Sequence, residues 1–318
     1  MSERKSAVPN LTRPDLISRI EELKEERKAI ILVHNYQRPE VQDIADFRGD
    51  SLGLSQAAAQ TKAEVIVFCG VHFMAETAAI LSPDKIVLLP DRNAGCPMAD
   101  MITAVQLRDM KKLHPRAKVV CYVNTTAEVK AESDICCTSA NAVKVVNSFS
   151  LEEEIIFVPD KYLGIYVRSR TGRNLILWEG YCPTHVKILP EDILQQKRLH
   201  PEAKVIVHPE CRPEVIALAD EVRSTTGICE YARETSSREI IVGTEIGILY
   251  RLKQENPEKI FYPATERAVC PNMKLTTLEK ILWSLEALQP RVTVNEEIRQ
   301  GALIAVNRML VLKAKPKE

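Results

Sequence analysis

The sequence predicts an α/β fold of three homologous parallel domains, each in three layers, related by a pseudo-threefold axis. The first observation is a repeat: apolar, β-branched segments that begin at residues 31, 119 and 205 align without gaps, spaced 88 and then 86 residues apart. The second is a cysteine-proline pair that closes each repeat at a similar spacing. The third is that strand-like and helix-like segments alternate, which is typical of parallel sheets covered by helices.

Each repeat begins with a short apolar strand that ends in polar residues, as buried parallel strands do. The three strands read Ile31-Leu32-Val33-His34, Val119-Val120-Cys121-Tyr122 and Val205-Ile206-Val207-His208. The register continues beyond them, since Asp46 aligns with Asp134 and Asp220. Agreement at so many positions indicates three copies of one unit.

A helical segment follows in each repeat, then a second apolar strand and a further strand. The helical segments are predicted at 52–62, 140–148 and 227–233, and the second strands at 65–69, 154–158 and 239–242. The spacing between copies exceeds that of ordinary solenoid repeats, so three small domains around an axis fit better than a solenoid.

The repeats divide the chain into four predicted parts. The first α/β repeat, with an N-terminal helix, is predicted over residues 1–100, the second over 101–187 and the third over 188–275. Residues 276–318 form the C-terminal part, where apolar periodicity predicts amphipathic helices at about 275–288 and 294–312. We expect these helices to pack across the repeats.

Composition restricts the classes of function. The chain has 43 Lys and Arg against 43 Asp and Glu, which argues against a dedicated nucleic-acid binder. Its apolar runs are too short to cross a membrane, and the N-terminus lacks the apolar core of a signal peptide. A cytoplasmic protein is therefore expected. Nine cysteines, an odd number, are then unsuited to a disulfide framework.

Threefold symmetry turns the repeat into a prediction of a central active site. Ligands of open α/β sheets bind beyond the carboxyl ends of the strands, so equivalent positions of the three repeats should meet around one cavity. The first ring of equivalents is His34, Tyr122 and His208, and the second is Tyr36, Asn124 and Glu210. Any one of them alone could be an ordinary buried polar residue, but two rings of titratable groups favour a site.

A third ring consists of hydroxyl residues that precede the helical segments: Ser51, Ser139 and Thr225. Each could simply cap its helix, because Ser and Thr are favoured at that position. Alternatively, three helix N-termini around one cavity would bind a small polyanion through free N–H groups and the positive end of the helix dipole.

The fourth ring is Cys96, Cys182 and Cys270, each followed by proline. They could be three structural thiols, but their shared place in the repeat favours a common metal. Close Cys-x-x-Cys pairs, frequent in structural zinc sites, are absent from the sequence. Three thiolates without an obvious fourth ligand suit a 4Fe-4S cluster with one open iron, which would act as a Lewis acid. Catalytic zinc is the alternative. The other cysteines are expected mainly to pack in the core. The adjacent Cys136 and Cys137 could instead form a vicinal redox pair, although packing is favoured for them as well.

The motifs taken together resemble the quinolinate synthase family over essentially the whole chain. The main ones are His34-Asn35-Tyr36, Gly95-Cys96-Pro97-Met98-Ala99-Asp100, Tyr181-Cys182-Pro183-Thr184-His185, His208-Pro209-Glu210-Cys211 and Cys270-Pro271-Asn272-Met273-Lys274. The resemblance implies condensation of iminoaspartate with dihydroxyacetone phosphate to give quinolinate, phosphate and two waters in de novo NAD biosynthesis. It also implies that the three ring cysteines hold the cluster, and it leaves room for a transient contact with the enzyme that supplies iminoaspartate.

Roles for the ring residues follow from the chemistry that this resemblance implies. Proton transfers are assigned to Glu210, Tyr36 and Tyr122, with Glu210 the first choice for general acid and base. Substrate binding is assigned to His34, Ser51, Asn124, Ser139, His208 and Thr225. Some members of the family carry extra cysteines near the last ligand, read as a redox switch. No cysteine follows Cys270 here, which argues against such regulation.

Two other functions remain open at this point. One is a different open-iron hydro-lyase that acts on another small acid. The other is an iron-sulfur sensor that binds a partner or DNA, against which the neutral charge and the polar rings count.

Overall fold

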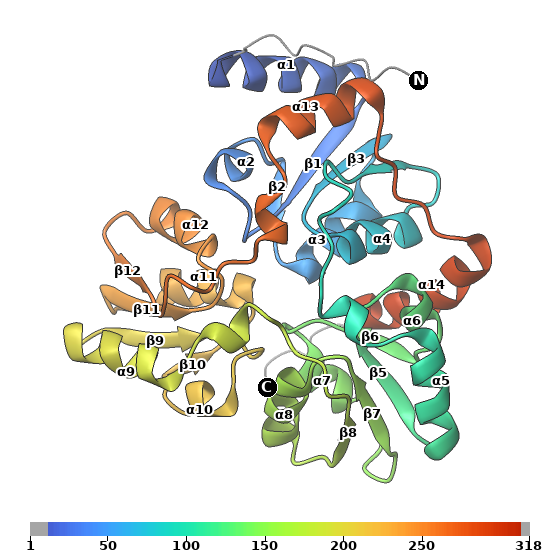
Figure 1. Ribbon diagram of the computed structural model, residues 1–318, viewed down its shortest axis with the longest axis vertical. Helices are drawn as coiled ribbons and strands as arrows, with labels where there is room; N and C mark the ends of the chain where they lie inside the picture. Colours follow the sequence, from blue (N-terminus) through green and yellow to red (C-terminus); the bar gives the residue numbers. More distant parts are fainter. Residues whose placement is uncertain (1–11, 313–318) are drawn as a thin grey trace.

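The computed structural model describes residues 12–312, and it confirms the predicted fold class. Three four-stranded sheets, all parallel, form three lobes around a common centre (Figure 1). The sheet orders are β2-β1-β3-β4, β6-β5-β7-β8 and β10-β9-β11-β12, so the same topology occurs three times. No helix in the described range is long and apolar enough to cross a membrane.

The strands of each sheet lie inside one predicted domain, while the domain boundaries themselves stay a prediction. The first sheet contains β1 (Ala29–His34), β2 (Phe47–Gly49), β3 (Val65–Cys69) and β4 (Ile86–Leu88). The second contains β5 (Lys118–Tyr122), β6 (Ile135–Cys137), β7 (Ile155–Val158) and β8 (Leu175–Leu177). The third contains β9 (Lys204–Val207), β10 (Glu221–Val222), β11 (Glu239–Gly243) and β12 (Ile260–Pro263).

The helices repeat with the strands. One helix precedes each sheet: α1 (Arg13–Glu26), α5 (Ala104–Leu113) and α9 (Pro190–Leu199). A short helix follows the first strand: α2 (Pro39–Asp43), α6 (Ala127–Ala131) and α10 (Pro213–Ile216). The next helices are α3 (Ser51–Gln60), α7 (Ala142–Val146) and α11 (Thr225–Glu234), then α4 (His72–Leu81), α8 (Lys161–Thr171) and α12 (Ile248–Glu255). A single 3-10 turn ends each repeat: η1 (Ala99–Met101), η2 (His185–Lys187) and η3 (Asn272–Lys274).

Burial on both faces explains why the central strands are continuously apolar. In β1, Ile31 and Val33 pack toward α1, whereas Leu32 lies in the large core shared by the repeats. β9 alternates in the same way, with Val205 and Val207 on one face and Ile206 on the other. Side chains of a strand alternate between faces, so a sheet with helices on both sides needs apolar residues throughout.

The edge strands β2, β6 and β10 were not predicted, because two or three residues are too few for a periodic pattern. The aligned aspartates hold them. The carboxylates of Asp46, Asp134 and Asp220 each accept a hydrogen bond of 2.8 Å from a backbone N–H of the neighbouring central strand. The backbone N–H of each aspartate donates back to the carbonyl of the same strand residue. This reciprocal pair fixes the register just before the edge strand, so the aspartates recur for a structural reason.

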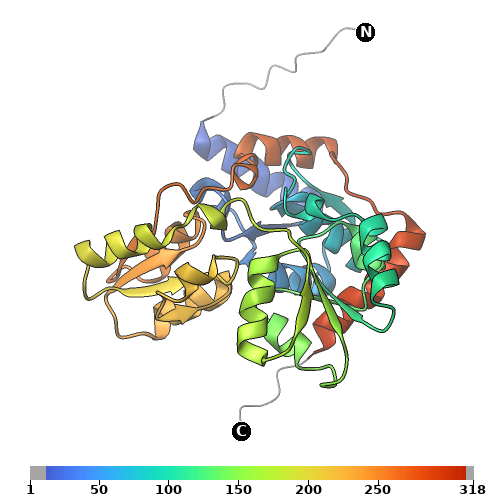
Figure 2. The same cartoon turned by 60° about the horizontal axis from the view of Figure 1, so that its bottom comes forward.

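The C-terminal helices differ in what they contact. α13 (Leu278–Ala287) packs on α1 and β3 of the first repeat. α14 (Glu296–Val311) contacts α4 of the first repeat and α6 and β6 of the second, and its red ribbon runs beside the green α6 in Figure 1. Turned by 60°, the same helix still lies against that lobe (Figure 2). Only α14 among the described helices of this tail therefore bridges repeats.

Replacing Gly301 by leucine should loosen α14. A Cβ at this position would lie 3.0 Å from the Cβ of Ala131 and 3.3 Å from its Cα, so a larger side chain would push α14 away from α6. Overpacking of this kind costs about 1–3 kcal/mol, so we expect a lower urea midpoint for loss of the helical circular dichroism signal. The exposed Asn307→Leu on the same helix is the control. Equal midpoints for the two variants would contradict the close packing.

Candidate functional site

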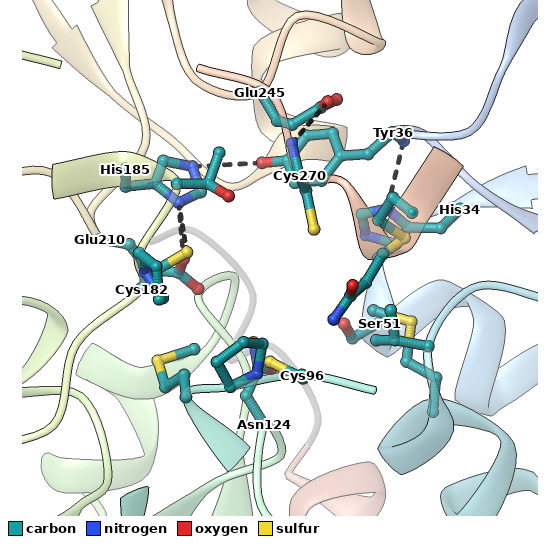
Figure 3. Close-up of a pocket in the computed structure, with 18 of the residues that line it drawn as sticks. His34, Tyr36, Ser51, Cys96, Asn124, Cys182, His185, Glu210, Glu245 and Cys270 are labelled. Atoms are coloured by element: carbon teal, nitrogen blue, oxygen red, sulfur yellow. Dashed lines mark hydrogen bonds and ion pairs between the residues drawn. The ribbon is translucent and has the colours of Figure 1, made fainter. Parts of the chain in front are cut away.

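Every residue of the four predicted rings lines a single cavity of about 200 Å³ at the centre of the three repeats. β1 and β5 end at His34 and Tyr122, and His208 follows the last residue of β9. The turns after these strands carry Tyr36, Asn124 and Glu210 to the same cavity. Figure 3 shows side chains from all three lobes pointing into this space. The arrangement joins residues far apart in the sequence, as the symmetry argument expects, while their chemical roles stay predictions.

His34 and His208 are neutral hydrogen-bond donors. The backbone N–H of Tyr36 donates to Nδ1 of His34 at 3.2 Å, and that of Glu210 donates to Nδ1 of His208 at 3.3 Å. Burial lowers the pKa of both imidazoles to about 3. Since Nδ1 accepts a hydrogen bond in each neutral ring, the proton must be on Nε2. Nε2 of His208 lies 3.1 Å from the hydroxyl of Ser139.

Glu210 is a buried carboxylate held by two hydrogen-bonding side chains. Nδ1 of His185 lies 2.8 Å from one carboxylate oxygen, and the hydroxyl of Tyr122 donates to the other. The ring of His208 stacks on that of His185, with centroids 4.7 Å apart. Burial alone would raise the pKa of Glu210, but His185 and the hydrogen bond from the Tyr122 hydroxyl hold it below its usual value. Glu210 therefore rests as an ionised carboxylate.

A hydrogen-bonded chain connects Tyr36 to this carboxylate. The hydroxyl of Tyr36 lies 2.5 Å from that of Thr244, which lies 2.8 Å from Nε2 of His185. Since Nδ1 of His185 faces Glu210, its proton belongs there and Nε2 accepts from Thr244. Burial raises the pKa of Tyr36 well above its ordinary value, so the phenol stays protonated. The site thus holds a proton donor and a proton acceptor joined by two intermediate groups.

Asn124 and the hydroxyl ring supply polar groups for a ligand. Among the described residues, Oδ1 of Asn124 is a buried oxygen without a hydrogen-bond partner, although it lines the cavity. An unpaired buried acceptor costs about 1–3 kcal/mol, which a ligand that donates a hydrogen bond would recover. Nδ2 of Asn35 donates to Thr225 at 3.0 Å, so the hydroxyl proton of Thr225 is free to point elsewhere.

The hydroxyl residues do not cap their helices, so that alternative is wrong. Ser51 and Thr225 are the first residues of α3 and α11, where Asp50 and Ser224 are the caps and accept from Gly53 and Gly227. Among the helices of residues 12–312, only these two have an N-terminus that reaches the cavity beside a ring hydroxyl. The helix expected directly after Ser139 starts later, at Ala142, because the N–H of Thr138 donates to Asn141 at 2.7 Å and forms a turn. Ser139 reaches the cavity from this turn.

The three ring cysteines are equivalent in their surroundings as well as in sequence. Each thiol lies just before a 3-10 turn, and the backbone N–H groups of the second and third residues after each cysteine lower the pKa of its thiol. Proline contributes no N–H at the position directly after each cysteine. Nδ2 of Asn272 donates to the carbonyl of Gly95 at 2.8 Å, which ties the Cys270 turn to the Cys96 turn. The three side chains, half-buried, point toward one central space in Figure 3.

These thiols would bind a metal as thiolates. Burial, and to a lesser extent its neighbour Cys270, raise the pKa of Cys96 to about 12. Burial raises the pKa of Cys182 and of Cys270 as well. A raised pKa favours the protonated thiol. A cation bound between the three sulfurs would favour the thiolate instead, and its binding would release protons. The other six cysteines are buried, and none lines this cavity. Cys136 lies opposite Cys121 in the β5–β6 register.

Cys182 also belongs to a second group that could hold a metal ion. Ligand atoms of Cys182, His185 and Glu210 lie within 4.8 Å of one another. However, Nδ1 of His185 lies closer to Glu210, at 2.8 Å, than to the sulfur of Cys182, at 3.2 Å. A proton donated from Nδ1 to the carboxylate leaves this nitrogen no lone pair for a metal. The hydrogen bond between His185 and Glu210 therefore favours proton transfer over metal binding in this group. The three ring cysteines are the better metal ligands.

The prediction from the rings missed His185 and Glu245. His185 is the third residue after Cys182, whereas the equivalent positions hold Ala99 and Met273, so this base breaks the symmetry. Glu245 is fully buried, with one oxygen 3.2 Å from the backbone nitrogen of Cys270 and 2.9 Å from Nζ of Lys274. It holds the Cys270 loop in place. The sequence signal that could have found them is their position. His185 lies three residues after Cys182, and Glu245 lies two residues after the end of β11.

The strand register shows why Glu245 escaped the symmetry argument. Ile31, Val119 and Val205 pair with Val67, Ile156 and Ile241, which makes Val71, Asp160 and Glu245 equivalent. These three are 89 and then 85 residues apart, so an alignment without gaps from the first strands does not superpose them. Loops of different length between the first and second strands shift the spacing by one residue.

A family model and individual relatives of known sequence point to the same family. A family described as "Quinolinate synthetase A protein" matches residues 18–311. The quinolinate synthase of Dehalococcoides mccartyi (strain CBDB1) is 64% identical over 297 residues, which cover 93% of this chain and 98% of the relative. The quinolinate synthase of Methanosarcina barkeri (strain Fusaro) is 59% identical over 299 residues, 94% of this chain and 98% of the relative.

Proposed function

Because the chain belongs to the quinolinate synthase family, we propose that it condenses iminoaspartate with dihydroxyacetone phosphate. The products are quinolinate, phosphate and two waters, in de novo NAD biosynthesis. The atoms of substrates and products balance without an oxidant or a reductant, so the reaction is a dehydrating condensation of the transferase type. The observation that carries the proposal is that all four rings, with His185 between them, line one cavity.

The donor set fits a 4Fe-4S cluster held by Cys96, Cys182 and Cys270. Three thiols face one space, each with backbone N–H groups aimed at its sulfur, and hydrogen bonds of this kind tune iron-sulfur centres. No fourth cysteine lines the cavity within the described residues. When bound, such a cluster would offer one open iron as a Lewis acid for a substrate oxygen or nitrogen.

Anion binding is assigned to neutral donors. The substrates carry carboxylates and a phosphate, and Nε2–H of His34 is available to these oxygens. The hydroxyls of Ser51, Ser139 and Thr225 add donors, together with the first N–H groups of α3 and α11. Nε2–H of His208 donates to the hydroxyl oxygen of Ser139 at 3.1 Å and so holds this hydroxyl in place. Neutral donors bind anions without a buried cation, in keeping with the zero net charge of the chain.

Proton transfers are assigned to the two ends of the hydrogen-bonded chain. Glu210 takes protons from carbon when the enamine forms and when the triose carbons isomerise. Tyr36 donates toward a departing hydroxyl, and Thr244 and His185 hold its hydroxyl in the hydrogen-bonded chain that ends at Glu210. Tyr122 holds the Glu210 carboxylate through its hydroxyl, and Asn124 orients the substrate through its unpaired oxygen. Free cysteines at all nine positions support a reducing, cytoplasmic location.

The test of this function is a substrate assay on anaerobically purified protein. Iminoaspartate is generated in the cuvette by an L-aspartate oxidase and mixed with dihydroxyacetone phosphate. We expect quinolinate and inorganic phosphate in equal amounts. Phosphate release without quinolinate, or no product with either substrate, would contradict the proposal. Turnover of an unrelated hydroxy acid instead would indicate a different open-iron hydro-lyase.

A further inference from the structure

A second cavity lies next to the active cavity and is larger, at about 660 Å³. Residues of all three repeats line it, and none of the three ring cysteines does. It shares Asp50 and Ser139 with the active cavity, so the two spaces meet at the hydroxyl ring. This second space, bounded by Arg48, Gln56, Ser139, Arg170, Arg223 and Arg251, is called the arginine vestibule below.

Arginines outnumber carboxylates among the residues that line the arginine vestibule. Four arginines line it against the carboxylates of Asp50 and Glu230, although the chain as a whole has no net charge. Arg251 is paired with Glu255 at 2.6 Å, and Arg223 with Glu221 at 3.0 Å.

Two of the arginines are not neutralised. Arg48, half-buried on β2, bonds to the neutral side chain of Gln254 at 2.8 Å. Arg170, exposed in the last turn of α8, has no carboxylate within ion-pair distance among residues 12–312. They come from two different repeats and face the same space. Their charges are available to an anion in the vestibule.

A hydrogen-bonded relay connects this space with the active cavity. Nη1 of Arg251 donates to Oδ1 of Asn35 at 2.8 Å, and Nδ2 of Asn35 donates to the hydroxyl of Thr225 at 3.0 Å. Asn35 is fully buried between them. The arginine therefore fixes the amide, and the amide donates to the Thr225 oxygen and leaves the hydroxyl proton of Thr225 free. Hydrogen bonds thus connect the vestibule with the hydroxyl ring.

We propose that the arginine vestibule is an outer binding site where small dianions with phosphate or carboxylate groups collect before they pass the hydroxyl ring. This inference rests on the proposed function, because it takes the anionic substrates as its ligands. Arginines without a carboxylate partner in a cleft raise the local concentration of anions and their association rate. Neutral hydrogen-bond donors at the inner ring then bind the anion. A buried arginine in their place would have to lose its hydration, which costs free energy.

The first test removes one unpaired charge. Arg170→Gln should lower kcat/KM for dihydroxyacetone phosphate about threefold at low ionic strength, and Arg48→Gln with Arg170→Gln about tenfold, with kcat affected less. Because salt screens the electrostatic attraction, the kcat/KM values of the variants and of the wild type should converge near 1 M salt. Arg168→Gln, exposed on the same helix but outside the vestibule, is the control. Equal salt dependence in Arg170→Gln and Arg168→Gln would overturn the proposal.

The second test obstructs the vestibule. Gln56 is exposed on α3 and lines it, whereas Gln60, exposed on the same helix, does not. Gln56→Trp should lower kcat/KM at least about tenfold and leave the iron content unchanged, while Gln60→Trp should behave as wild type. Equal kinetics for both tryptophan variants would contradict passage through this space.

A binding measurement separates this inference from the proposed function. Inorganic phosphate is titrated into the wild-type holoprotein and into Arg48→Gln/Arg170→Gln by isothermal calorimetry. Weaker phosphate binding in the double variant is expected. If the wild type makes no quinolinate but shows this difference, the proposed function is wrong and the outer anion site stands. If quinolinate is made and phosphate binding is equal in both, the outer site is wrong.

Discussion

Replacing Cys96, Cys182 or Cys270 by alanine is expected to abolish bound iron and sulfide and to lower quinolinate formation about a thousandfold or more. Each thiol comes from a different repeat, so two remaining ligands cannot hold the cluster. A Lewis-acid metal contributes several kcal/mol to a transition state, and this corresponds to about a thousandfold in rate. Iron and sulfide analysis, the visible spectrum and the quinolinate assay measure the effect.

Cys229→Ala is the matched control for these variants. Cys229 is fully buried in α11 and lies outside the cavity lining, so its loss should leave the cluster and the activity in place. A circular dichroism spectrum of each variant shows whether the fold is kept. A ring-cysteine variant that keeps full iron content and activity would show that the three thiols are not the ligands.

Replacing Glu210 by glutamine is expected to lower kcat by about 10²–10⁴-fold, the usual contribution of a general base. Glutamine has the same shape and still accepts the proton of His185, but it cannot take a proton from substrate. The iron content should not change, because the three cysteines hold the cluster in this account. Steady-state kinetics and iron analysis of the same preparation test both statements.

The Glu210 variant also decides between the two metal-binding groups. If a single ion were held by Cys182, His185 and Glu210, the glutamine variant would lose its metal together with its activity. A loss of activity with full iron content supports proton transfer at Glu210. Full activity with full iron content would remove Glu210 from the mechanism.

Much of the fold and of the site could be predicted because the chain repeats itself. Equivalent strand ends in three copies must face the same axis, so His34, Tyr122 and His208 could be placed together without knowledge of any contact. The same reasoning brought together Cys96, Cys182 and Cys270, which are too far apart in sequence for a local motif. The structure places both sets in one cavity.

What symmetry could not reveal is where the copies differ. His185 has no titratable equivalent in the other repeats, so no ring contained it, although it connects Tyr36 with Glu210. The edge strands were too short for a pattern, and Ser139 lies in a turn whose shape depends on Asn141. The arginine vestibule was hidden by a net charge of zero, since composition does not show where charges lie.

The central claim is that three cysteines from three repeats hold an iron-sulfur cluster on which quinolinate formation depends. The most direct measurement is iron and sulfide content of the anaerobically purified protein, read with a quinolinate assay before and after removal of the cluster by a chelator. We expect about four iron and four sulfide per chain, with activity that falls in proportion to the cluster lost. Protein without iron or sulfide that still makes quinolinate at the full rate would contradict the account.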